Sequence, residues 1–258
     1  MVKKSYAKVN IFLKIVGTKE NYHLLASRFA RVKNLFDIIE FQKGDFNSFT
    51  LEGNFGCTTE KNTIYKAYKQ LIKISNDVEK YFTMHKVTVI KNIPEFAGLG
   101  GGSSNAATFM LMVNEVCNLK LSKDTLAKIG ATIGADIPFF IYEYDSANVS
   151  GIGEIVKPFE EETLDITTIT PPIQCNTGAI FKRYREQFYK NISSSEIDKL
   201  FSTKSIDIYH NLSIDQANDL YLPAISVNNQ LVRENLNINN QALFSGSGSS
   251  FFNINQRG

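Results

Sequence analysis

A glycine-rich stretch near the middle of the chain has the clearest capacity for chemistry. Four glycines occupy the five positions Gly98–Gly102, and Ser103, Ser104 and Asn105 follow at once. Glycine lets successive backbone N–H groups turn toward one point, and the N-terminus of a helix adds unpaired donors and a partial positive charge. Such a loop can hold a polyphosphate, while the serines can cap the helix or contact a phosphate oxygen or Mg²⁺.

The segments around this loop are expected to be regular. Lys86–Ile90 is rich in β-branched residues and predicts a strand, whereas Ser103–Leu119 is apolar nearly all round and predicts a buried helix. A flexible hinge capped by Ser103 is the structural alternative. The entropy cost of so many glycines, and the apolar helix that begins at once, favour a phosphate loop. No lysine follows the glycines as in a Walker A loop, and the last glycine of a dinucleotide fingerprint is missing.

Asp136 is the candidate acid–base residue. It lies two residues after Gly134, where a helix that starts at Ser122 is predicted to end, and Pro138 prevents the helix from continuing. A carboxylate on a short, rigid turn could position an alcohol and take its proton during phosphoryl transfer. The same spacing also suits a solvated turn residue.

Lys8 and Asn10 lie on the less apolar face of a predicted strand, Tyr6–Val16, in which polar and apolar residues alternate. The strand rise separates them by about 7 Å. The pattern predicts a half-buried strand. Lys8 and Lys14 could therefore be ordinary exposed residues, and a plain hydrogen-bonding role for Asn10 is as plausible as a ligand contact.

Further elements complete the prediction. Leu35–Phe41 is predicted to form a strand, and Asn62–Ser75 a helix. Ala242–Ile254 is predicted to form a strand–turn–strand or a strand–turn–helix around a Ser-Gly repeat. The character of the chain changes near Pro158, with an acidic run and a Pro-Pro pair beyond it. We therefore expect two lobes, 1–157 and 158–258.

Composition excludes several classes of protein. The 258 residues carry 28 Lys+Arg against 26 Asp+Glu, and 43% are hydrophobic, which is ordinary globular usage and gives no general field for nucleic acid. No apolar run approaches the roughly 20 residues that span a bilayer. The three cysteines lack a CxxC pair, and no His/Cys spacing suits a metal. We expect a soluble, cytoplasmic protein, a monomer or weak homodimer, without a nucleic-acid or membrane partner.

Four segments, in order along the chain, resemble the GHMP kinases. Pro94–Asn105 resembles their second motif, Ser5–Leu13 the first, Gly134–Pro138 the segment that holds the catalytic aspartate, and Ser245–Ser249 the third. The extra glycines resemble the extended glycine loop of those members that phosphorylate 4-diphosphocytidyl-2-C-methyl-D-erythritol. The resemblance implies an α+β fold with an ATP-binding lobe and a substrate-binding lobe.

The resemblance also implies an activity. The γ-phosphoryl of ATP would move to the 2-hydroxyl of that cytidine diphosphate-linked substrate, with Mg²⁺ as cofactor, in non-mevalonate isoprenoid synthesis. Another GHMP kinase with a homoserine- or mevalonate-type alcohol, and a nucleotide-binding regulator that no longer catalyses, are the alternatives.

Residue roles follow from the same resemblance. Asp136 and Lys8 would be the catalytic pair. The nucleotide would contact Pro94, Gly98, Leu99, Gly100, Gly101, Gly102, Ser103, Ser104, Asn105, Asn62, Ile64 and Lys91. The acceptor would contact Asn10, Tyr22, His23, Phe181, Gly246 and Ser247, with its cytosine stacked between Tyr22 and Phe181. The alternative is that Tyr22 packs the first hairpin and Phe181 the second lobe's core.

Overall fold

The computed structural model describes residues 1–19, 22–232 and 236–255, without the side chains of residues 19 and 22. The chain forms two compact units. Unit 1 comprises Met1–Ala7, Leu35–Ile93 and Gly100–Glu143, and unit 2 comprises Lys8–Asn34, Pro94–Leu99 and Tyr144–Gly258. This division differs from the single boundary expected at residue 157, because the long strands β1 (Val2–Lys19) and β2 (Tyr22–Lys43) contribute to both units.

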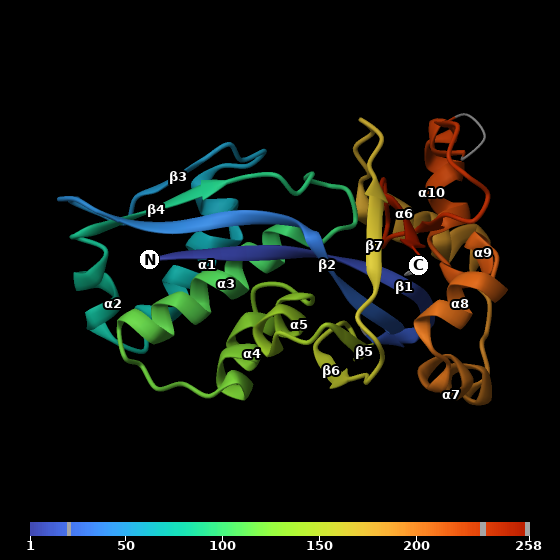
Figure 1. Cartoon of the computed structure of the whole chain (residues 1–258), viewed down its shortest axis with the longest axis horizontal. Helices are drawn as coiled ribbons and strands as arrows, with labels where there is room; N and C mark the ends of the chain where they lie inside the picture. Colours follow the sequence, from blue (N-terminus) through green and yellow to red (C-terminus); the bar gives the residue numbers. More distant parts are fainter. Residues whose placement is uncertain (20–21, 233–235, 256–258) are drawn as a thin grey trace. The chain divides into compact units, whose positions relative to one another are not determined.

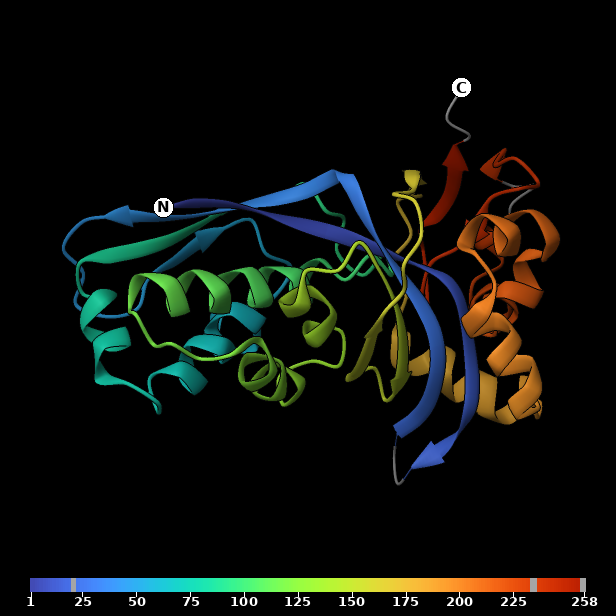
Figure 2. The ribbon, with the colours of Figure 1, turned by 60° about the horizontal axis from the view of Figure 1, so that its bottom comes forward.

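Unit 1 is a sheet with helices on one face (Figures 1 and 2). The central strand β4 (His85–Ile90) pairs antiparallel with β2 and parallel with β3 (Leu51–Gly53). The helices are α1 (Thr63–Leu71), α2 (Asn76–Tyr81), α3 (Gly101–Val116), α4 (Lys123–Ala131) and α5 (Ile137–Tyr142). The predicted helix starts at Asn62 and Ser122 are confirmed, since both side chains accept N–H bonds at the starts of α1 and α4. Helix α4 ends at Ala131, before the predicted stop at Gly134.

Helix α3 is the core of unit 1, as its all-round apolar sequence predicts. Its buried residues include Phe109, Met110 and Met112, and it packs against α1 and α5. The Phe109 ring meets Phe41 edge-on at 5.7 Å and stacks with Phe82 at 5.6 Å. Each such side chain contributes about 1.5–3 kcal/mol on burial. The axis of α3, and with it the position of its N-terminus, is therefore held by the core.

Unit 2 combines two sheets with a set of helices. The first half of β2 pairs antiparallel with β5 (Ser146–Gly151), which pairs with β6 (Ile155–Pro158). A second sheet has the order β7 (Asp165–Ile169), β9 (Phe251–Asn255), β8 (Leu243–Phe244). The strand–turn–strand alternative for Ala242–Ile254 is thus confirmed. The helices are α6 (Thr177–Arg183), α7 (Ser194–Ser202), α8 (Ser205–Asn211), α9 (Ile214–Ala217) and α10 (Tyr221–Val227).

Strand β1 is buried on both faces between Ala7 and Ile15, so the predicted half-buried strand is wrong. Lys8 and Lys14 are only 4% and 5% exposed. Lys14 Nζ lies 2.5 Å from Asp219 Oδ1, and burial lowers the pKa of Lys14 while Asp219 opposes that shift. Asp219 comes from 205 residues further along the chain. The polar face is buried because distant segments pair with its polar groups, which periodicity does not reveal.

None of the helices in the described part of the chain is long and apolar enough to cross a membrane. The three cysteines are free thiols. Burial raises the pKa of Cys175 and of Cys117 to about 11, because the thiolate form is poorly solvated there.

Arg28 provides a stability test in unit 2. Its side chain is fully buried and donates to the carbonyls of Thr203 at 2.5 Å and Phe201 at 2.7 Å, at the end of α7, with Phe159 3.4 Å from the guanidinium. Arg28→Met removes the donor of the Thr203 carbonyl, while the Phe201 carbonyl keeps its bond from Asn148 Nδ2 at 3.0 Å, so we expect the free energy of unfolding to fall by about 1–3 kcal/mol. Urea denaturation measures the change. An unaltered midpoint and slope would show that water replaces the guanidinium at no cost.

Candidate functional site

In unit 1, the glycines form the start of α3. Gly100 is the N-cap in the left-handed conformation, with φ of 70°, and Gly101 and Gly102 are the first two helical residues. A Cβ on Gly101 would lie 2.9 Å from Ile93 Cγ2. Glycine is required at Gly100 by conformation and at Gly101 by close packing. The free N–H groups of the first helical turn are thereby available to a ligand.

Helix α1 supports the start of α3. Thr63 Oγ1 donates to the carbonyl of Gly102 at 2.6 Å, which joins the N-terminal ends of the two helices. Asn62 precedes Thr63 and caps α1 by accepting from Ile64 N–H at 2.9 Å, while Ile64 itself is fully buried. Sequence reasoning missed Thr63, because a threonine at a helix start carries no signal for a contact 39 residues away.

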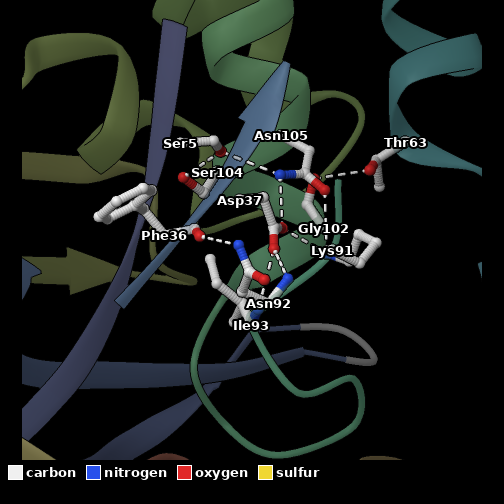
Figure 3. Close-up of polar contacts among 10 residues, drawn as sticks. All are labelled: Ser5, Phe36, Asp37, Thr63, Lys91, Asn92, Ile93, Gly102, Ser104 and Asn105. Carbon is white, nitrogen blue, oxygen red and sulfur yellow. Dashed lines mark hydrogen bonds and ion pairs between the residues drawn. The ribbon is translucent and has the colours of Figure 1, made fainter. Parts of the chain in front are cut away.

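Ser103 differs from the two residues that follow it. Ser104 is 1% exposed and its hydroxyl lies 2.7 Å from that of Ser5, while the amide of Asn105 is engaged by Ser5, Asp37 and Lys91 (Figure 3). Ser103 is half-buried, and its Oγ lies 3.5 Å from where a Cβ on Gly134 would be. Because Ser104 and Asn105 point inward, the backbone N–H groups and the Ser103 hydroxyl are the groups of this turn that could contact a ligand.

Asp136 lies on the turn between α4 and α5, close to the start of α3. It is the N-cap residue of α5, half-buried, and its side chain makes no capping bond to that helix. Because Gly134 is adjacent to Ser103, the turn that carries Asp136 is next to the first turn of α3 within the same unit. A carboxylate and a helix N-terminus therefore share one region of unit 1.

Lys91 is one of the residues that the family resemblance predicts to contact the nucleotide. Its ammonium forms a 2.5 Å ion pair with Asp37 and also donates to Asn105 Oδ1 at 3.0 Å (Figure 3). The side chain is 9% exposed. Lys91 therefore belongs to a buried polar cluster behind the glycine turn.

In unit 2, Lys8 is held by Asn10 and by the beginning of the glycine loop. Lys8 Nζ donates to Asn10 Oδ1 at 2.7 Å and to the carbonyl of Gly98 at 3.0 Å, and it lies 4.7 Å from the centre of the Phe29 ring. Asn10 Nδ2 donates to Ser27 Oγ at 3.0 Å. Asn10 thus orients Lys8, and the ammonium is a fixed, buried positive charge.

The third-motif segment packs backbone to backbone against this loop. Ser245 Oγ donates to the Gly98 carbonyl at 2.9 Å, and a Cβ on Gly98 would lie 2.1 Å from the Ser245 carbonyl oxygen. Asn218 donates to the carbonyls of Phe244 at 2.8 Å and Gly246 at 2.9 Å, so it fixes the other side of the turn. Ser247 Oγ lies 2.8 Å from Thr177 Oγ1. Asn218 carries no sequence signal, because it lies far from every motif.

Two of the aromatic candidates of unit 2, His23 and Phe181, are in contact. His23 and Phe181 stack with centroids 4.8 Å apart and planes at 30°, and the Tyr184 ring lies edge-on to His23. The side chain of Tyr22 lies outside the described residues, so the stacking of cytosine between Tyr22 and Phe181 stays a prediction. Arg185 Nη1 lies 3.5 Å from His23 Nε2, and a guanidinium only donates, so this nitrogen accepts. Burial and then Arg185 lower the pKa of His23, which favours a neutral ring.

The chain is similar to known proteins over nearly its whole length. Residues 62–144 match the family described as GHMP kinases N terminal domain. A protein of Sulfurimonas denitrificans named 4-diphosphocytidyl-2-C-methyl-D-erythritol kinase is 49% identical, over 98% of this chain and 97% of that protein. One of the same name from Sulfurovum sp. (strain NBC37-1) is 45% identical, over 97% of each. The crystal structure of a 4-(cytidine 5'-diphospho)-2C-methyl-D-erythritol kinase superposes with a TM-score of 0.74 at 26% identity, covering 98% of this chain and 90% of that one.

Proposed function

This chain belongs to the 4-diphosphocytidyl-2-C-methyl-D-erythritol kinases of the GHMP family, and from that membership we propose the details of its reaction. The predicted family, α+β fold and small-molecule kinase class are confirmed. The chain is an ATP-using enzyme of non-mevalonate isoprenoid synthesis. The γ-phosphoryl of ATP passes to the 2-hydroxyl of 4-diphosphocytidyl-2-C-methyl-D-erythritol, and ADP leaves.

The start of α3 is the observation that carries the nucleotide part of the proposal. Gly100 ends the loop in a left-handed conformation, and the next residues begin helix α3, most of whose side chains are buried in the core of unit 1. Backbone N–H groups at such a helix start, together with the helix dipole, bind phosphate without a lysine in the motif. The inward side chains of Ser104 and Asn105 keep that turn rigid.

The catalytic roles are proposed for Asp136 and Lys8, as the family resemblance implies. Asp136 in unit 1 takes the proton of the acceptor hydroxyl as its oxygen attacks the γ-phosphorus. Lys8 in unit 2, oriented by Asn10, supplies a positive charge that stabilises the charge building on the transferred phosphoryl group. The buried position of Lys8 supports this role, because an ammonium acts most strongly where water is excluded.

Mg²⁺ is proposed as the cofactor. Among the described residues there is no group of three or more His, Cys, Asp or Glu side chains that could hold a metal by themselves. Mg²⁺ typically binds through one or two carboxylates, waters and the substrate phosphates, so the neighbouring Ser103 hydroxyl and Asp136 turn fit it. When bound, the ion neutralises phosphate charge beside the start of α3.

The acceptor site is proposed to include His23 and Phe181. A stacked aromatic pair, with His23 neutral and its Nε2 engaged by Arg185, offers a flat surface and one remaining N–H donor to a pyrimidine. The stacking of the cytosine between Tyr22 and Phe181 remains part of the proposal, as do contacts of the acceptor with Gly246 and Ser247.

Phe181→Ala tests this acceptor site. We expect the KM for the cytidine-linked substrate to rise about 5- to 150-fold, because base–aromatic stacking contributes about 1–3 kcal/mol. The KM for ATP should not change. Steady-state kinetics and the melting temperature are measured on the same preparation. A lower melting temperature with a normal acceptor KM would make Phe181 a packing residue.

An ADP-release assay tests the whole proposal. The wild-type enzyme is given ATP with the cytidyl-methylerythritol substrate, and in parallel with homoserine or mevalonate. We expect release with the first only, and competition by CDP against the acceptor. Release with an alcohol that lacks cytidine favours the other GHMP kinases, and ATP binding without release under every alcohol favours a regulator.

The compartment and assembly remain proposals. Free thiols at Cys57, Cys117 and Cys175 support a reducing compartment such as the cytoplasm. A monomer or weak homodimer is also proposed, and light scattering of the purified chain measures the oligomeric state.

A further inference from the structure

Asp37 is a fully buried carboxylate in β2, outside every sequence motif. Its Oδ1 accepts from the backbone N–H groups of Asn92 at 2.7 Å and Ile93 at 2.8 Å. Its Oδ2 accepts from Lys91 Nζ at 2.5 Å and Asn105 Nδ2 at 2.8 Å. Figure 3 shows the carboxylate at the centre of these four donors.

The four donors come from the two ends of the glycine-rich segment. Lys91, Asn92 and Ile93 are the last residues of unit 1 before the chain leaves it at Pro94, and Gly100 is where the chain returns. Asn105 lies in the second turn of α3, three residues after Gly102. One carboxylate therefore joins the entry to the loop with its exit.

The cluster continues to the helix start itself. Asn105 Nδ2 also donates to Ser5 Oγ at 2.9 Å, and Ser5 Oγ lies 2.7 Å from Ser104 Oγ. Lys91 Nζ lies 3.5 Å from where a Cβ on Gly101 would be. The Asp37 carboxylate thus holds the Lys91 ammonium close to the first turn of α3. Through Asn105 and Ser5 it also orients Ser104.

A contribution to folding stability does not by itself explain why such a buried polar cluster is present. Burying an ion pair costs desolvation that its attraction only partly recovers, and apolar residues of the same volume often serve folding equally well. Four converging hydrogen bonds do, however, define a single geometry.

We propose that Asp37 is a positioning residue for nucleotide binding: it joins the two ends of the glycine segment, so that the N–H groups at the start of α3 are prearranged for the phosphates of ATP. This inference rests on the proposed nucleotide site. Asp37 makes no contact with the ligand and acts through Lys91, Asn105 and the backbone of residues 92 and 93.

Asp37→Asn is the first test. The amide keeps the size of the side chain, but its Nδ2 would face the donors of Lys91 and Asn105. We expect the Kd for Mg²⁺–ADP, measured by calorimetry well below the melting temperature, to rise about 10- to 100-fold, the scale on which supporting partners of a ligand site act. The acceptor KM at saturating ATP should change less than about twofold.

Two further variants separate positioning from folding. Arg28→Met removes a comparably buried charged side chain in unit 2, and it should lower the melting temperature without changing the Kd for Mg²⁺–ADP. Ser5→Ala removes only the far end of the cluster and should fold normally. We expect it to raise that Kd about 2- to 5-fold, as for one lost hydrogen bond.

The outcomes are distinct. A raised Kd in Asp37→Asn and Ser5→Ala, with none in Arg28→Met, supports the proposal. Unchanged Mg²⁺–ADP affinity in Ser5→Ala and in folded Asp37→Asn, beside normal wild-type binding, overturns it and leaves the proposed function intact. Wild-type protein that does not bind Mg²⁺–ADP overturns both.

Discussion

Replacing Asp136 by asparagine is expected to lower kcat by about 10²–10⁴, the scale of a lost acid–base group, while ADP affinity stays within about twofold. Asparagine has the shape of aspartate but cannot take the proton of the acceptor hydroxyl. The turn between α4 and α5 should keep its conformation, because asparagine fills the same space as aspartate and Pro138 still fixes the start of α5. Steady-state kinetics and calorimetry with ADP measure the two quantities.

Asp124→Asn is the matched control. Asp124 lies on α4 in the same unit and accepts from Tyr142 Oη at 2.9 Å on the surface. Its loss removes the same charge from the same unit and should leave kcat unchanged. A fall of less than about threefold in Asp136→Asn would withdraw the role of base from Asp136.

The second large effect is expected at Gly98. Gly98→Val should lower the free energy of unfolding by more than about 3 kcal/mol, because two independent penalties add. Gly98 has φ of 75°, and its Cβ would lie 2.1 Å from the Ser245 carbonyl oxygen. That oxygen belongs to the backbone, so the rotation of a side chain cannot relieve the clash. Urea denaturation measures the loss, and kcat should fall because the Gly98 carbonyl also holds Lys8.

Gly102→Ala is the control for Gly98. Its Cβ would lie 3.5 Å from Thr63 Oγ1, an ordinary contact, and the residue is helical. Alanine favours a helix over glycine by about 1 kcal/mol, so stability should be unchanged or higher. If Gly98→Val unfolded at the wild-type urea concentration, the close packing of Gly98 against Ser245 would not exist in solution.

Local sequence was sufficient for the elements that hold the site. Asn62 and Ser122 predicted two helix starts correctly, because a cap is an interaction between near neighbours. The apolar residues of α3 predicted a buried helix, since no face of it could be solvated. The stop of α4 was misplaced by three residues, because Gly134 continues the turn through its bond to Gly130 beyond the last helical residue.

Side-chain direction within the motif was not predictable. Ser103, Ser104 and Asn105 are consecutive polar residues that the sequence presents alike. Only the tertiary structure turns Ser104 and Asn105 toward Ser5 and Asp37, leaving Ser103 half-buried beside Gly134. Similarly, positive φ falls on Gly98 and Gly100, which the glycine run does not distinguish from its neighbours.

The sequence by itself determined the family, and it predicted the phosphate loop and the candidate catalytic residues, because each motif consists of residues close together in the chain. The tertiary structure decided the burial of Lys8 and Lys14, the use of Asn218 and Thr63 as supports, and the position of Asp37 across the ends of the loop. Asp37 meets Asn105 across 68 residues and Lys14 meets Asp219 across 205. Periodicity states which residues share a face, but only the packed chain states what covers that face.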